Sequence, residues 1–112
     1  MIFLSPTVIF LGIFDMPNYR NCFPDYDDTL PKLEGFFDSS YKNDSCPSLS
    51  DDADPDPENC IYIFCDYKEP TRREGGETSP RFRVLNGYAT GNYIFDSNNW
   101  GEVVQFIKEL KK

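Results

Sequence analysis

Proline constrains the fold of this chain more than any other residue, because six prolines fall within one stretch: Pro17, Pro24, Pro31, Pro47, Pro55 and Pro57. Proline ends helices and removes a hydrogen-bond donor from sheets. The stretch is also rich in Asp, Asn and Ser, so the sequence predicts a long irregular insert over residues 17–58. Its scattered aromatic residues are expected to pin it to the body of the protein: Tyr19, Phe23, Tyr26, Phe36, Phe37 and Tyr41.

Apolar runs on both sides of this insert predict the strands of a small antiparallel sheet. The runs "TVIFLGIF" and "CIYIFCDYK" are apolar on both faces, as in buried strands. The run "RFRVL" alternates apolar and polar residues, and "LNGY" is a typical two-residue type I′ hairpin signal. The return strand contains Gly91-Asn92, which marks a bulge or a competing turn. The strands are expected near 7–14, 60–68, 81–86 and 88–96.

The C-terminal segment has the pattern of an amphipathic helix that packs on this sheet. Apolar side chains recur there at helical spacing on one face: Trp100, Val103, Val104, Ile107 and Leu110. Asn99 is placed to cap the helix, and Glu102 three residues later completes a start similar to a capping box. The sequence therefore predicts an α+β fold and a single domain over 1–112, with a C-terminal helix over 99–111.

Charge is distributed unevenly along the chain. The net charge is −8, yet residues 15–66 hold thirteen acidic and three basic residues, a net of −10. Residues 67–112 hold eight basic and six acidic residues, a net of +2. An acidic surface repels nucleic acid and anionic membranes and attracts basic proteins, many of which bind nucleic acid. The charge therefore predicts a basic protein surface as partner, without direct nucleic-acid or membrane binding.

The chain contains no histidine, so it lacks the commonest general base and metal ligand. It also lacks a phosphate-binding glycine loop and a nucleophile motif, so we expect no enzyme activity and no catalytic residues. Asp52-x-Asp54-x-Asp56 resembles the start of a calcium loop. However, Pro57 stands where Gly should turn the chain, and Ile63 stands where Glu should close the site. No metal or cofactor is therefore expected.

The cysteines leave two redox environments open: Cys22, Cys46, Cys60 and Cys65. An even count in a small chain suits disulfides in a secreted protein. Within a strand, however, Cys60 and Cys65 would lie about 16 Å apart, too far for a disulfide. The apolar N-terminus lacks the preceding positive charge and the small-residue cleavage site of a signal peptide. Free thiols and a cytoplasmic location are therefore expected.

A small basic and aromatic patch offers another candidate surface: Arg72, Arg73, Arg81 and Arg83, with Tyr67, Phe82 and Tyr88. Such patches stack on nucleic acid and neutralise it. A charged strand face is the simpler interpretation, and the net negative charge opposes nucleic-acid binding. We therefore expect the binding surface on the acidic segment instead.

Eight acidic side chains of the insert are the candidate partner-binding residues: Asp25, Asp27, Asp28, Asp51, Asp52, Asp54, Asp56 and Glu58. The last five lie on a stretch stiffened by Pro55 and Pro57. Carboxylates spaced along an extended backbone resemble a row of phosphates. Such a surface suits a basic cleft that normally holds nucleic acid.

The expected function is that of a non-enzymatic inhibitor from a phage or other mobile element, similar to anti-CRISPR proteins. It would act in the host cytoplasm by blocking the nucleic-acid-binding cleft of a host nuclease complex. Small acidic chains without histidine are also typical of bacterial immunity proteins that neutralise a cognate toxin. A secreted disulfide-bonded protein is a third alternative. This expectation is an analogy from size and charge and depends on no family motif.

Overall fold

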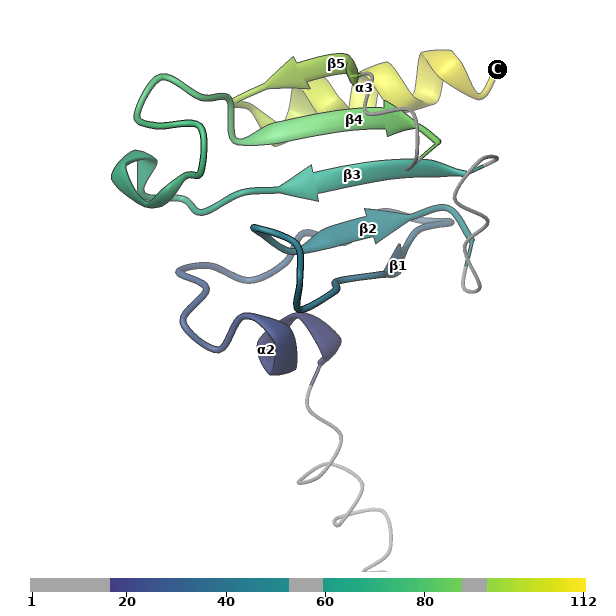
Figure 1. Ribbon diagram of the computed structural model, residues 1–112. Helices are drawn as coiled ribbons and strands as arrows, with labels where there is room; N and C mark the ends of the chain where they lie inside the picture. Colours follow the sequence, from purple (N-terminus) through teal and green to yellow (C-terminus); the bar gives the residue numbers. More distant parts are fainter. Residues whose placement is uncertain (1–16, 53–59, 88–92) are drawn as a thin grey trace, which may run out of the picture.

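A computed structural model describes residues 17–52, 60–87 and 93–112. This part of the chain forms an antiparallel sheet with the strand order β1-β2-β3-β4-β5. The strands are β1 Phe37–Asp38, β2 Ser48–Ser50, β3 Ile61–Cys65, β4 Phe82–Asn86 and β5 Tyr93–Ser97. The helices are α2 Asn18–Cys22, the 3-10 helix η1 Pro70–Arg72 and α3 Trp100–Leu110. Figure 1 shows α3 behind β4 and β5, and α2 near the β1 edge.

The predicted antiparallel sheet with a C-terminal helix is therefore confirmed, and β3 is its central strand. Alternate side chains of β3 point to opposite faces of the sheet. Ile63 and Cys65 join the main core together with Val103 and Ile107 of α3. Tyr62 belongs to a second buried cluster on the other face. This is why the sequence of β3 is apolar at almost every position.

The structure confirms the predicted start of α3 and changes its predicted apolar face. The Asn99 side chain accepts a hydrogen bond from the Glu102 N–H at 3.1 Å, as a helix cap should. Val103 and Ile107 are buried, but Leu110 is exposed at the helix end. Phe106 takes its place in the packing, because its ring stacks on Phe95 with centroids 4.5 Å apart.

The prediction of an irregular insert over 17–58 is not confirmed for the part that the structure describes. Residues 17–52 supply α2, β1 and β2, and both strands pair within the sheet. Tyr19, Phe23 and Tyr26 are buried in the main core, so these three aromatic anchors are confirmed. Phe37 and Tyr41 are exposed instead, and Phe36 is half-buried. Proline interrupts the helices and strands here without preventing the segment from joining the core.

The β4–β5 hairpin is present, but its register excludes the predicted two-residue turn. A type I′ turn at Asn86-Gly87 would place Leu85 opposite Tyr88. Leu85 instead pairs with Tyr93, and a register shift near Val84 and Leu85 marks a bulge. Gly87 donates its N–H to the Cys60 carbonyl at 2.9 Å, so this end of β4 remains joined to the β3 side.

Two predicted features lie wholly or partly outside the described residues. The strand near 7–14 is one, and the first part of the strand near 88–96 is the other.

All four cysteines are described, and each is a free thiol in the structure. Within the described ranges, no helix is long and apolar enough to cross a membrane.

Candidate functional site

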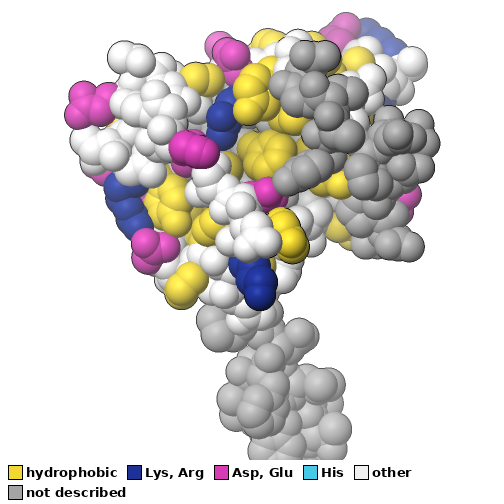
Figure 2. Space-filling view, in the orientation of Figure 1, with side chains coloured by type: hydrophobic (Ala, Val, Ile, Leu, Met, Phe, Trp, Pro, Cys, Tyr) yellow, Lys and Arg dark blue, Asp and Glu magenta, His cyan; other side chains and the backbone are white. Residues whose placement is uncertain are grey.

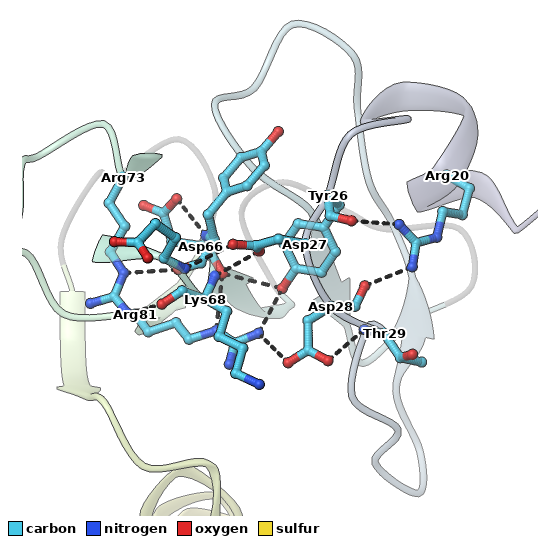
Figure 3. A network of polar contacts seen from close by, with 11 residues as sticks. Arg20, Tyr26, Asp27, Asp28, Thr29, Asp66, Lys68, Arg73 and Arg81 are labelled. Carbon is cyan, nitrogen blue, oxygen red and sulfur yellow. Dashed lines mark hydrogen bonds and ion pairs between the residues drawn. The ribbon is translucent and has the colours of Figure 1, made fainter. Parts of the chain in front are cut away.

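The predicted partner-binding acids fall into two groups that the structure treats differently. Asp25, Asp27 and Asp28 follow α2 and contact the connection between β3 and β4, where the predicted basic patch begins. Figure 3 shows Asp27 and Asp28 beside this connection. Asp51 and Asp52 follow β2, at the start of the turn towards β3. The remaining acids, Asp54, Asp56 and Glu58, lie outside the described residues.

Asp25 and Asp27 bind the segment around η1. The Asp25 carboxylate lies 2.7 Å from the Arg72 guanidinium and accepts a hydrogen bond from the Tyr67 hydroxyl at 3.0 Å. Asp27 accepts the backbone N–H groups of Lys68 and Glu69, both at 2.8 Å. These contacts join positions more than forty residues apart in the sequence, so the two carboxylates hold the α2 segment against the η1 loop.

Asp28 belongs to a more buried network centred on Arg81. The Arg81 guanidinium lies 2.9 Å from the Asp28 carboxylate and 3.2 Å from the Tyr26 hydroxyl. The same guanidinium also donates to the backbone carbonyl of Asp66 at 3.1 Å. Arg20 supports this network from α2 by donating to the carbonyls of Tyr26 and Asp28. Figure 3 shows these side chains converging between α2 and the end of β3.

The basic patch is therefore bound largely to the acidic half of the chain. Arg72, Arg81 and Arg83 each pair with an aspartate, and the third of these pairs is Arg83 with Asp66 at 3.5 Å. Arg73 donates instead to backbone carbonyls, including those of Tyr67 and Ser79. The charge contrast between the two halves of the sequence is thus partly cancelled by ion pairs inside the fold. On the face of the molecule shown in Figure 2, acidic and basic side chains are interspersed, with no large area of a single charge.

The pKa values of these aspartates reflect their surroundings. Burial alone would raise the pKa of Asp27, but hydrogen bonds from the Glu69 and Lys68 N–H groups lower it below its usual value. The Thr29 N–H and the Arg81 guanidinium lower the pKa of Asp28. Burial raises the pKa of Asp66, although the Tyr67 N–H and Arg83 oppose this shift. Asp27 and Asp28 are therefore held as carboxylates by the groups they bind.

Asp51 is the first residue of the acidic turn, a name given to residues 51–58, which lie between β2 and β3 in the sequence. Its N–H donates to the Ile61 carbonyl at 3.1 Å, and its carboxylate accepts the Ile61 N–H at 2.9 Å. The other carboxylate oxygen lies 2.9 Å from the Lys111 ammonium group at the end of α3. Residues 51 and 61 are thereby held side by side, and the acidic positions 52–58 fall between them in the sequence.

No metal-binding cluster is found among the described residues, and the pKa values of the Cys22, Cys46 and Cys65 thiols are raised rather than lowered. No cluster of three or more His, Cys, Asp or Glu residues in the described ranges is placed to hold a metal ion. Burial raises the pKa of Cys46 to about 12 and that of Cys65 well above its usual value. Both thiols are therefore protonated at neutral pH, which opposes a role as nucleophile.

The sequence did not reveal which acids have structural roles. Asp66 is one of the thirteen acids of residues 15–66, but no local pattern in the sequence predicts that it is buried beside Arg83. The pairing of Asp25 with Arg72 spans 47 positions, and no local pattern encodes such a contact.

Comparisons with protein-family models, curated proteins and solved structures find no match for this chain.

Proposed function

We propose that this protein is a non-enzymatic inhibitor that presents an acidic turn to a basic, nucleic-acid-binding surface of another protein. The partner we propose is a host nuclease complex, and the source is a phage or other mobile element, so that the protein acts in the host cytoplasm as an anti-CRISPR-like, anti-defence factor. This proposal follows from the charge distribution of the sequence, because five carboxylates fall between residues 51 and 58.

The observation that carries the proposal is the fixed base of the acidic turn. Asp51 and Ile61 exchange two hydrogen bonds, and Lys111 ties the same aspartate to the end of α3. Pro55 and Pro57 restrict the backbone between these points. A loop with fixed ends and restricted backbone loses less conformational entropy on binding than a free tail does. Carboxylates on such a turn can approach a cationic cleft at low entropic cost.

The internal contacts narrow the set of side chains that a partner is expected to use. Asp25, Asp27 and Asp28 already bind arginines or backbone N–H groups of the same chain, so a partner must compete for their oxygens. Their role in partner binding stays a prediction. Asp51 supports the base of the turn. The principal partner-binding residues of the proposal are the four acids that follow it in the sequence: Asp52, Asp54, Asp56 and Glu58.

The proposal is tested by capture from a bacterial lysate, with the full chain immobilised and the lysate treated with nuclease. We expect a basic protein to be retained, and we expect added double-stranded DNA to release it because both ligands occupy the same cleft. A variant with Asp52→Asn, Asp54→Asn, Asp56→Asn and Glu58→Gln should retain much less of this protein. Asp51 is left unchanged so that the base of the turn stays intact.

A matched control removes four exposed acids elsewhere: Glu34→Gln, Glu74→Gln, Glu77→Gln and Asp96→Asn. It has the same net charge as the turn variant. We expect it to capture the partner almost as well as the unaltered chain. Equal loss in both variants would assign binding to overall charge, and equal retention in both would contradict the proposal.

A further inference from the structure

An apolar groove of about 800 Å³ lies beside β1, and none of the residues that line it belongs to the acidic turn. Its walls come from α2, from residues 29–38 and from β2, and most of its lining side chains are apolar. Phe37 is 48% exposed here, and Leu33 and Phe36 are only partly buried. The groove has the size of pockets that enclose sizeable apolar ligands, which is about 300–1,000 Å³.

We propose that this groove is the docking site of residues 7–14 of the same chain. This segment reads "TVIFLGIF" and contains no charged residue. Its pattern predicts a strand that is apolar on both faces, and such a strand requires apolar cover on both sides. The groove supplies an apolar surface next to β1, the edge strand of the described sheet.

The position of the chain favours this segment over a separate partner. Pro17 is itself a lining residue of the groove, so the preceding residues begin at its rim. The tether from Phe14 to Pro17 is three residues long and spans at most about 11 Å. A short tether of this kind gives the segment an effective local concentration of about millimolar or more. An external apolar peptide would have to outcompete that concentration.

The chemistry of the groove also fits an uncharged segment. Its charged lining residues, Lys32, Glu34 and Asp38, include both signs, so the groove has no strong preference for a charged ligand. The apolar wall instead favours aromatic and aliphatic side chains such as Ile9, Phe10 and Ile13. This inference is independent of the acidic turn and of the proposed function.

Photocrosslinking of the full chain tests the occupant directly. Phe10 is replaced by p-benzoylphenylalanine, a conservative aromatic change, and crosslinked peptides are mapped by mass spectrometry. We expect crosslinks within one chain to residues 29–38 or to Leu49. Crosslinks to other surfaces, a crosslinked dimer, or a yield no higher than with the same probe at Phe3 would overturn the proposal. A dimer would assign the groove to a second copy.

A pair of matched variants gives an independent measurement. Phe10→Asp places a charge in the docking segment, and Phe3→Asp places the same charge outside it. We expect Phe10→Asp to shift the methyl resonances of Leu30, Leu33 and Leu49, which line the groove. Phe3→Asp should leave these resonances in place. Identical spectra for the two variants would contradict docking, because the methyl groups would not sense the segment.

Discussion

The acidic segments at 25–28 and 51–58 look alike in the sequence, but we assign them different roles in the protein. The first segment binds arginines and backbone N–H groups of the chain itself, through Asp25, Asp27 and Asp28. The second begins at Asp51, whose contacts fix the base of a turn. The net charge of a sequence segment therefore overstates the charge available to a partner wherever the fold supplies the counter-charge.

Replacement of Arg81 should produce the largest change, because this residue holds the first segment in place. Arg81→Ala removes contacts to Asp28, the Tyr26 hydroxyl and the Asp66 carbonyl. We expect the free energy of unfolding to fall by about 3 kcal/mol, since a largely buried charged group and its partners lose their hydrogen bonds. Urea unfolding measures this change. Arg81→Lys keeps the charge and should cost less, and a loss below about 1 kcal/mol for Arg81→Ala would show that the network is dispensable.

Replacement of Asp27 should have a smaller effect of the same kind. Asp27→Ala leaves the N–H groups of Lys68 and Glu69 without their carboxylate acceptor. Because water can replace part of this interaction at the surface, we expect a loss of about 1 kcal/mol in urea unfolding. The exposed Glu77→Ala serves as control and should change stability by less than about 0.5 kcal/mol. Similar values for the two variants would remove the distinction between the acidic segments.

Acid titration should expose the first segment as well. The pKa values of Asp27 and Asp28 are lowered in the folded chain, so both groups stabilise the fold above their unfolded pKa of about 3.9. This stability is lost as the pH falls from there through their folded pKa values. The pKa of Asp66 is raised in the folded chain, so ionisation of this group lowers the stability of the fold. This loss of stability develops as the pH rises above about 3.9, the unfolded pKa. Urea midpoints between about pH 5 and pH 2 should fall less steeply in an Asp27→Ala, Asp28→Ala variant. An unchanged slope would contradict the assigned shifts.

Neutralisation of the second segment should have the smallest effect on folding. The turn variant, with Asp52→Asn, Asp54→Asn, Asp56→Asn and Glu58→Gln, leaves the Asp51 contacts intact. We expect its free energy of unfolding to stay within about 0.5 kcal/mol of the unaltered chain, as for other surface changes. A stability loss above about 1 kcal/mol would mean that these acids also serve the fold.

The sequence predicted the C-terminal half of the fold well because local patterns encode it. The apolar run of β3, the alternation of β4 and the Asn99 cap of α3 are each visible within a few residues. The sequence did not predict β1 and β2, because these strands are only two and three residues long. Strands this short have no period to read, and their pairing depends on neighbours distant in sequence. A high density of proline predicts that helices and strands are interrupted, but it does not predict whether the segment is buried in the core.

The sequence predicted which acidic residues make up the candidate site, but it did not predict which residues they contact. Counting acids identified both segments, but the pairs Asp25–Arg72 and Asp28–Arg81 join positions 47 and 53 residues apart. Only the folded chain shows that the basic patch and the first acidic segment bind each other. The same limit applies to Asp66, because its burial follows from packing at the end of β3.

The rate of association with the captured partner, measured at several salt concentrations, shows directly whether the acidic turn binds that partner. We predict that the turn variant associates at least about tenfold more slowly at low salt and shows a flatter salt dependence, while the four-charge control behaves like the unaltered chain. Equal association rates of the turn variant and the unaltered chain, at low and at high salt, would contradict partner binding by the acidic turn.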